Sequence, residues 1–303
     1  MNHFVPWDIR VTLDLFLGGL GVGAFLLSVW VGRFDDRERY SQIVKVGAFV
    51  APIAVIVGLL FLLSELGRPE RFITTLFRVN PTSVMSWGVF LQGGFVVIAL
   101  LYALKVRKLS ENPSSGAAVK VLGTVLALAV GLYHGLLLSS NVARPLWRDG
   151  VFPLIMLLSS LLAGIAFVLL VSSITARRVS SASDAKTGYP MSLARLLAGL
   201  TLFTVLSLFT WYLSLLNAGL EAAEALNALL TAYGALWWGG AIVLGLIVPL
   251  VLLLLYILSS KDPQADNLPL AVGSAISVLL LVGSFVLKHV LLQAGQVNFP
   301  GLF

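Results

Sequence analysis

A single carboxylate, Asp14, lies a few residues inside the first long apolar segment of this chain. A charged group in such a segment is costly in free energy, so an acidic residue there is interpreted first as functional. The other chemically active side chains of the apolar segments are Glu65, Tyr133, His134, Lys288 and His289. A carboxylate together with a phenol and an imidazole can exchange protons with a bound ligand, and this is the chemistry that the set predicts.

The composition indicates that membrane-spanning helices position these residues. Of 303 residues, 58% are hydrophobic and 11% are charged, which is more apolar surface than a soluble core can bury. Runs of about 20 apolar residues are long enough to cross a bilayer as helices. Eight such runs predict spans at Asp8–Gly32, Lys45–Leu66, Thr82–Leu104, Val119–Asn141, Val151–Ile174, Leu193–Asn217, Ala235–Ser259 and Leu268–Gln293. The predicted fold class is therefore an all-α integral membrane protein with eight transmembrane helices.

The charges of the loops predict the orientation in the membrane. Lys and Arg gather on one side, at Arg33, Arg37, Arg39, Lys45, Lys105, Arg107, Lys108, Lys120, Arg177, Arg178, Lys186, Arg195 and Lys261. Because positive loops stay in the cytoplasm, both termini are predicted to lie on the outer, periplasmic side of the cell (inner) membrane. The net charge of +6 is explained in this way, and no nucleic-acid partner is predicted.

The connectors suggest an organisation in two halves. The segment from Arg177 to Tyr189 is interpreted as the division between a first four-helix bundle, residues 1–176, and a second, residues 177–303. The first bundle is predicted to carry the site. Outside the membrane, Gly219–Tyr233 has the spacing of a short amphipathic helix that lies on the surface.

The predicted spans place the ionisable residues in the same half of the membrane. Asp14 is six residues from the outer start of the first span, and Tyr133 is eight residues from the outer end of the fourth. At 1.5 Å per residue, both lie roughly 10 Å deep. Lys288 and His289 fall at a similar depth, whereas Glu65 lies at the outer boundary.

A shallow site of this kind suits the oxidation of a quinol or the reduction of a quinone. That reaction moves two protons with two electrons, so it needs a hydrogen-bond donor to the quinone oxygen and a base within reach. Tyr133 or His134 is the candidate donor and Asp14 the candidate base. Arg10 lies one helical turn before Asp14 on the same face and is included among the candidate binding residues.

Each of these residues also has a purely structural interpretation. Asp14 and Arg10 can form an ion pair. His134 and His289 can be packed side chains with one satisfied hydrogen bond each. Lys288, near a helix end, can extend its ammonium group to the membrane surface.

The sequence contains no cysteine, which excludes iron–sulphur clusters, thiolate metal sites and covalently attached haem within it. A membrane b-haem commonly needs two histidines on facing helices, and only His134 and His289 lie within spans. Neither a haem nor a metal site is predicted.

Four segments together resemble the NrfD/polysulphide reductase membrane-subunit family. They are DLFLGGLGVG (Asp14–Gly23), ELGRPERF (Glu65–Phe72), NPTSVMSWG (Asn80–Gly88) and NVARPLW (Asn141–Trp147). The match in order and spacing covers the first half of the sequence closely. The second half agrees in hydropathy and in the stretch from Trp237 to Pro249.

The resemblance implies an eight-helix protein of two four-helix bundles. Such a protein exchanges electrons between membrane menaquinone or ubiquinone and a ferredoxin-like iron–sulphur subunit docked outside. That subunit serves a molybdopterin catalytic subunit or a multihaem cytochrome. The resemblance aligns Tyr133 with a quinone-contacting tyrosine of the family, whereas Asp14 replaces a histidine and Arg10 lies near the position of an asparagine.

The predicted outer loops carry five arginines that suit an acidic partner: Arg68, Arg71, Arg78, Arg144 and Arg148. Bound lipid phosphate is the alternative explanation for these charges. Glu65, beside the first of them, is interpreted as a helix cap or an ion-pair partner of Arg68.

These observations predict the quinone-reactive membrane anchor subunit of a respiratory oxidoreductase complex, enzymatic only together with its partners. Protons are predicted to exchange at the outer face, with no proton path across the membrane in this protein. Two alternatives remain. The first is a secondary transporter with Asp14 in its substrate site, and the second is a structural anchor with no quinone site of its own.

Overall fold

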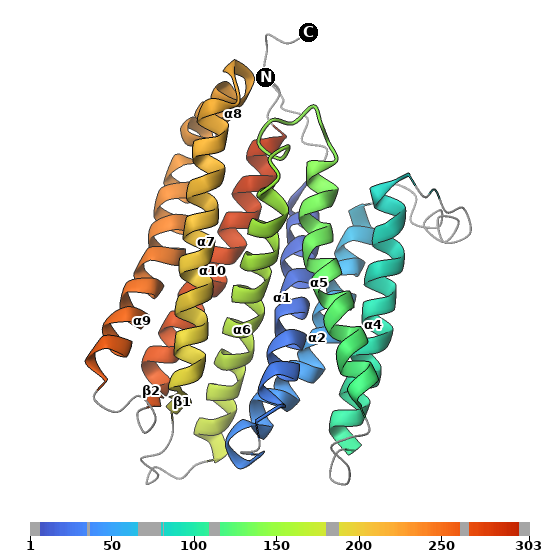
Figure 1. Cartoon of the computed structure of the whole chain (residues 1–303), viewed down its shortest axis with the longest axis vertical. Coiled ribbons are helices and arrows are strands. Elements are labelled where there is room, and N and C mark those ends of the chain that lie inside the picture. Colours follow the sequence, from blue (N-terminus) through green and yellow to red (C-terminus); the bar gives the residue numbers. More distant parts are fainter. Residues whose placement is uncertain are drawn as a thin grey trace.

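The structure is a computed structural model that describes residues 7–34, 37–65, 80, 82–108, 116–179, 188–260 and 267–296. Long helices pack side by side along one direction (Figure 1). They are α1 (Ile9–Val31), α2 (Arg37–Glu65), α4 (Val84–Lys108), α5 (Ala117–Ser139), α6 (Phe152–Val179), α7 (Met191–Asn217), α8 (Leu220–Gly234), the π-helix η2 (Ala235–Ile247), α9 (Val248–Ser259) and α10 (Leu270–Gly295). In this described part of the sequence, eight helical segments are long and apolar enough to cross a membrane, as the sequence predicted.

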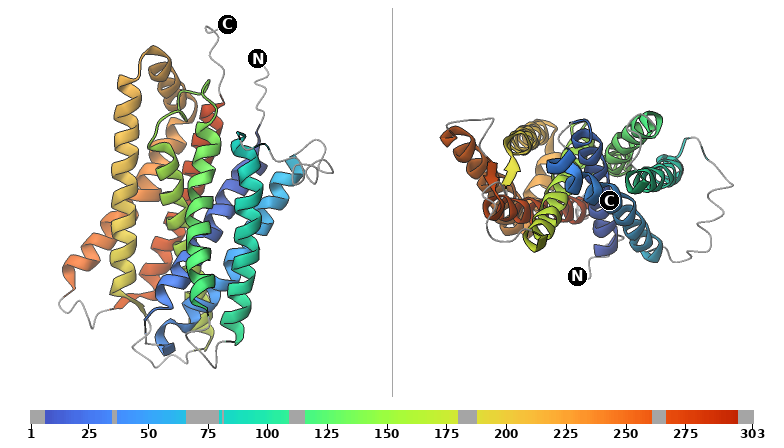
Figure 2. Two further views of the ribbon diagram at one scale, coloured as in Figure 1. Left: turned by 45° about the vertical axis from the view of Figure 1, so that its right-hand side comes forward. Right: turned by 90° about the horizontal axis from the view of Figure 1, so that it is seen from below.

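The start of α1 and the end of α10 lie at the same end of the bundle, which we call the terminal end (Figures 1 and 2). Hydrogen bonds of Trp7 with Gln293 and Gln296 join them. The backbone N–H of Trp7 donates to Oε1 of Gln296 over 2.8 Å, and Nε2 of Gln296 donates to the carbonyl of Trp7 over 2.9 Å. When the number of membrane-spanning helices is even, the start of the first helix and the end of the last lie on the same side, as they do here.

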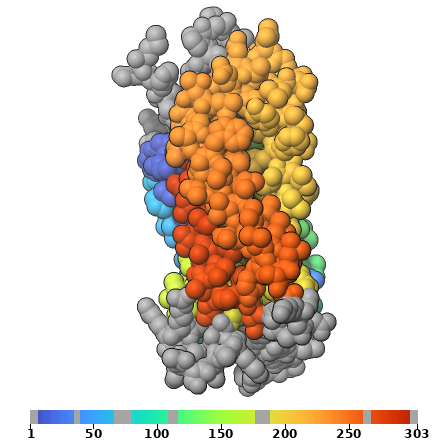
Figure 3. All heavy atoms as spheres, turned by 90° about the vertical axis from the view of Figure 1, so that its left-hand side faces the viewer, coloured from blue at the N-terminus to red at the C-terminus, as the bar shows by residue number. Residues whose placement is uncertain are grey.

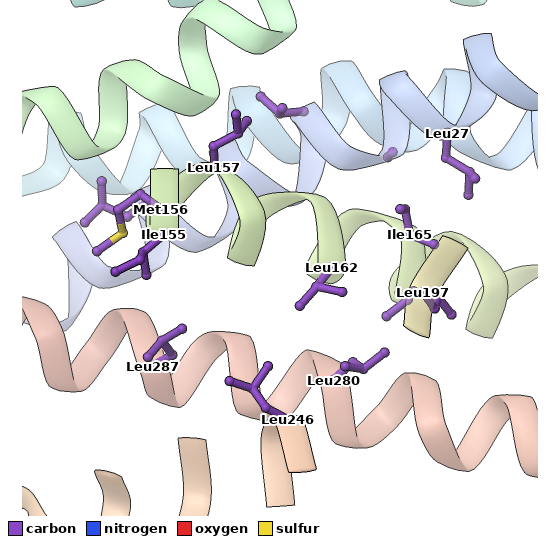
Figure 4. Packing of buried hydrophobic residues seen from close by; sticks show 14 of the residues in the cluster. Leu27, Ile155, Met156, Leu157, Leu162, Ile165, Leu197, Leu246, Leu280 and Leu287 are labelled. Carbon is purple, nitrogen blue, oxygen red and sulfur yellow. The ribbon is translucent and has the colours of Figure 1, made fainter. Parts of the chain in front are cut away.

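Helix α6 is the centre of the packing, with α1 on one side and α10 on the other (Figure 4). Glycines allow the backbones of α1 and α6 to touch, since a Cβ atom built on Gly23 would lie 2.9 Å from Cα of Gly164. On the other side, Leu162 of α6 and Leu280 of α10 fill the space between their helices. Close backbone contact of this kind stabilises membrane helices, because lipid gives little hydrophobic drive for their association.

The predicted boundary at residue 177 does not separate four helices from four. In the described residues five candidate spans come before it, the fifth ending at Thr175 within α6, and three follow. Because α6 packs against both α1 and α10, the two parts share an extensive contact along this helix.

The predicted all-α fold class is confirmed, and the structure adds one detail. Two short strands, β1 (Gly188–Pro190) and β2 (Asn267–Pro269), pair antiparallel at the end opposite the terminal end, with Tyr189 opposite Leu268. Each strand ends in a proline that directly precedes a helix, so α7 and α10 begin at Met191 and Leu270. The predicted starts were Leu193 and Leu268.

Among the remaining helices, α4 and α6 extend beyond their predicted ends, to Lys108 and Val179, and the largest difference is in α2. This helix begins at Arg37, eight residues before the predicted Lys45, because its first turns are polar and hydropathy alone does not detect them. Pro52 lies inside α2, which continues through it as one helix.

The seventh span is irregular in the turns that precede Pro249. The predicted amphipathic helix is present as α8, but it runs directly into η2 and α9, forming one column along the molecule (Figure 3). The turns of the π-helix η2 are wider than those of an α-helix. At its end the N–H of Val248 donates to the carbonyl of Val243, five residues earlier. A proline ring clashes with the carbonyl four residues earlier in an α-helix, so wider turns before Pro249 relieve that clash.

Candidate functional site

Four of the predicted polar residues lie buried in the half of the bundle nearest the terminal end. The relative exposures of Asp14, Tyr133, His134 and Lys288 are 4%, 6%, 0% and 0%. Asp14 is five residues after the start of α1 at Ile9, so it lies roughly 8 Å inside the helix. The expected depth and the expected gathering of residues from distant segments are both present.

Glycines on neighbouring helices make room for the site residues. A Cβ atom built on Gly18 of α1 would lie 2.8 Å from Cε1 of His134, so the imidazole rests directly on the α1 backbone. A Cβ atom on Gly58 of α2 would lie 3.2 Å from Oδ1 of Asp14. The hydroxyl of Tyr133 lies against Gly88 of α4, where a Cβ atom would overlap it.

The aromatic side chains of the site lie on α5. The rings of Tyr133 and His134 have centroids 6.1 Å apart. Tyr133 also lies close enough to Asp14 for the two to interact electrostatically. In the described residues neither ring nitrogen of His134 has a hydrogen-bond partner, although the side chain is fully buried. A buried imidazole without a hydrogen-bond partner is unusual in a packed protein and calls for an explanation.

Lys288 does not extend to the membrane surface, so that interpretation was wrong. Its Nζ atom donates to the carbonyl of Leu15 over 2.7 Å and to Oγ of Ser160 over 2.8 Å. The hydroxyl of Ser160 in turn donates to the carbonyl of Met156 over 2.7 Å. The lysine therefore connects α10 with α1 and α6 at the depth of the site.

Arg10 lies at the outer edge of the site and does not pair with Asp14 as the structural alternative suggested. In the described part of the sequence its ion-pair partners are Asp8 and Glu65, and Nη1 of Arg10 also donates to the carbonyl of Ser64 over 2.6 Å. Partial burial acts to raise the pKa of Asp8, but hydrogen bonds from Arg10 outweigh it and bring the pKa below its ordinary value. Arg10 thus joins the start of α1 to the end of α2.

The other histidine within a span, His289, has the features of a packed residue. Its Nδ1 atom is 3.2 Å from Oγ1 of Thr12, at hydrogen-bond distance, and its ring stacks on Phe285. No group of three or more His, Asp and Glu residues that could hold a metal ion occurs among the residues that the structure describes.

The predicted docking arginines are only partly described. Arg68, Arg71 and Arg78 lie outside the described residues. Arg148 is exposed, whereas Nη1 of Arg144 donates to the carbonyl of Gln296 over 3.1 Å.

The segment Asn141–Trp147, which follows α5, is attached to α10 by its tryptophan. The Nε1 atom of Trp147 donates to the carbonyl of Leu291 over 2.8 Å, and its indole stacks on Trp7. One function of this segment is therefore to hold the terminal end together.

Sequence reasoning missed three residues that shape the site: Gly58, Gly88 and Ser160. A glycine or serine in an apolar helix carries no signal of its own, since most such residues simply pack. Ser160 could have been found only by asking which group accepts a hydrogen bond from a buried lysine.

The fold and this cluster define an integral membrane protein that buries ionisable side chains near one end of its helices. The family described as "Polysulphide reductase, NrfD" matches residues 1–300, and the protein belongs to this family. It is therefore a multi-pass membrane protein. The resemblance given by four short motifs is confirmed, and it extends over nearly the whole sequence.

Individual relatives agree with this assignment, two of them over nearly their full lengths. The C subunit of polysulfide reductase from Wolinella succinogenes is 29% identical, with 96% of this sequence and 95% of that protein covered. Protein NrfD of Escherichia coli is 30% identical, with 98% and 97% covered. The Hdr-like menaquinol oxidoreductase integral membrane subunit of Archaeoglobus fulgidus is 24% identical over 56% of this sequence and 42% of its own length.

Proposed function

We propose that this protein is the quinone-reactive membrane subunit of a respiratory oxidoreductase complex. The observation that carries the proposal is the shallow buried cluster of Asp14, Tyr133 and His134, in which the imidazole has both nitrogens without a partner among the described residues. Membership of the family and the names of its relatives, a polysulfide reductase subunit and a menaquinol oxidoreductase subunit, support the same class of function.

A quinone or quinol supplies two-electron chemistry that is coupled to the transfer of two protons. Tyr133 is proposed to donate a hydrogen bond to a quinone oxygen, with His134 beside it as a second polar contact. Asp14 is proposed to exchange the proton as general base or acid. Arg10, held by Asp8 and Glu65, is proposed to stand at the entrance of the site.

The electrons are proposed to pass to a partner subunit, because this protein has no cysteine to bind an iron–sulphur cluster. A ferredoxin-like subunit at the terminal end would be close to the site, which lies in that half of the bundle. Arg148, Arg144 and the arginines at positions 68, 71 and 78 are proposed to face it. A molybdopterin subunit or a multihaem cytochrome would complete the complex.

The experiment that tests the proposal is the binding of a short-chain quinol analogue to the purified complex. We expect Tyr133→Phe to weaken binding about tenfold, the effect of one lost hydrogen bond of about 1.4 kcal/mol. Tyr102→Phe is the matched control, since Tyr102 is equally buried but bonds to Ser28 near the opposite end of α1. Absence of saturable binding in the folded wild type would refute the proposal and favour a transporter or a plain anchor.

The terminal end is proposed to face the outer side of the membrane, so that protons exchange with the outer aqueous phase. Since the protein has no cysteine, single introduced cysteines can report its orientation. Val142, at the terminal end, is 67% exposed, and Phe34, at the opposite end, is 41% exposed. We expect Val142→Cys to react with a membrane-impermeant maleimide in intact spheroplasts and Phe34→Cys to react only after permeabilisation. The reverse pattern would place the site on the cytoplasmic side.

A further inference from the structure

Lys288 is a lysine buried completely within a membrane-spanning helix. Its exposure is 0%, and two of its three donor positions are used by the carbonyl of Leu15 and the hydroxyl of Ser160. These are neutral acceptors, and they do not cancel the charge of an ammonium group. Burying such a charge without a counter-charge costs several kcal/mol. An acidic side chain nearby would offset part of this cost.

Asp14 is such a side chain. It directly precedes Leu15, whose carbonyl accepts from the lysine, so the carboxylate and the ammonium lie near each other at α1. In the described residues they do not form a direct ion pair within 4 Å. Two neighbouring faces of α1 are involved, one that carries Asp14 and one that faces Lys288. Asp14 and Gly18 lie four residues apart on the face toward the site, and Leu15 and Gly19 lie on the face toward Lys288.

The surroundings of the ammonium hold it in one place. A Cβ atom built on Gly19 would overlap both Nζ of Lys288 and Oγ of Ser160, so only glycine leaves room for this contact. Ser160 is itself fixed by its bond to Met156. The lysine consequently cannot follow a ligand, and its charge stays beside Asp14.

We propose that Lys288 is the fixed counter-charge of Asp14 and acts as a positioning residue for proton exchange, an inference that rests on the proposed function. When a quinol is oxidised to a quinone, its two O–H bonds break and two electrons pass to the iron–sulphur partner, while the Asp14 carboxylate takes up the two protons one after the other and releases each to the outer aqueous phase. Lys288 keeps its proton throughout. Its positive charge favours the ionised carboxylate, which is the form that accepts the proton.

The test is a double-variant cycle in the complete complex, with a soluble quinol analogue as substrate. Lys288→Met removes the charge and keeps most of the side-chain volume. We expect it to lower kcat about 100-fold while KM changes less than about threefold, because the substrate does not touch the lysine. In the background of Asp14→Asn, the same change is expected to have almost no further effect on kcat. A merely structural lysine would lower activity to the same degree in both backgrounds.

Three results overturn the inference. The first is an equal fall in kcat for Lys288→Met with and without Asp14, and the second is unchanged kcat in the single variant. The third applies if Lys288→Met does not assemble: it is a Ser160→Ala variant, in which the ammonium is loosened, whose kcat does not fall about tenfold in the wild type or falls equally in Asp14→Asn. Absence of quinol turnover in the wild-type complex would instead refute the proposed function itself.

Discussion

Asp14→Asn is expected to lower quinol turnover by about 100-fold to 10,000-fold while the complex remains assembled. An amide has nearly the shape of the carboxylate, so the space beside Gly58 stays filled, but it cannot accept the proton. Loss of a positioned general base costs rates of about this size. The measurement is the steady-state oxidation of a soluble quinol analogue by the purified complex, with subunit content determined in the same preparation.

The protein offers a matched control for this change. Asp149→Asn makes the same substitution just before α6, outside the site, where the side chain accepts a hydrogen bond from the N–H of Val151 over 2.7 Å. Asparagine can accept the same hydrogen bond as aspartate, so turnover is expected to change less than about twofold. Equal activity of Asp14→Asn and wild type would remove Asp14 from the mechanism.

The sequence predicted the spans and the depth of the site because both depend on length and hydropathy. A helix rises by a constant amount per residue, so Asp14 and Tyr133 could be placed at similar depths once their span ends were known. The same reasoning could not give the orientation of a side chain around its helix. For Arg10, sequence spacing pointed to Asp14, whereas the structure pairs it with Asp8 and Glu65.

Lys288 was misinterpreted for a related reason. A lysine seven residues before the end of a helix can reach the surface if nothing lies in its way. Whether it does so depends on neighbouring helices, and here α1 and α6 supply acceptors at Leu15 and Ser160 instead. Contacts between segments so distant in sequence leave no periodic signal in either one.

The short strands and the π-helix escaped prediction because hydropathy does not distinguish them from their surroundings. Tyr189 and Leu268 pair across a long stretch of sequence, and each lies in a three-residue strand. In η2 the change of helix type depends on packing as well as on Pro249. A Cβ atom on Gly245 would lie only 2.9 Å from the carbonyl of Gly240 and would overlap Gly283 of α10.

The motif glycines have two different functions that one pattern conceals. Gly23 brings the backbones of α1 and α6 together, as a small-residue face predicts. Gly18 and Gly19 instead make space for side chains, the imidazole of His134 and the ammonium of Lys288. The site is thus formed by the absence of side chains on one helix as much as by the polar groups of its neighbours.

Gly88→Ala applies this reasoning to Tyr133 and is the second change for which a large effect is expected. The added methyl group would overlap the hydroxyl of Tyr133, which is the free end of a side chain and therefore moves more readily than the helices. Displacement of a reacting contact by about 1 Å costs roughly 100-fold in rate. We expect a loss of this size in quinol turnover, with the complex still assembled.

Gly93→Ala is the control on the same helix, because a Cβ atom there has no neighbour within 4 Å. It is expected to leave turnover unchanged and to stabilise α4 slightly, since alanine favours the helix over glycine by about 1 kcal/mol. If Gly88→Ala acts through the tyrosine hydroxyl, its effect must shrink in the background of Tyr133→Phe, where the hydroxyl is gone. An undiminished loss of turnover in that background would mean that Gly88→Ala acts by disturbing the packing of α4 against α5. The position of the Tyr133 hydroxyl would then not be the cause.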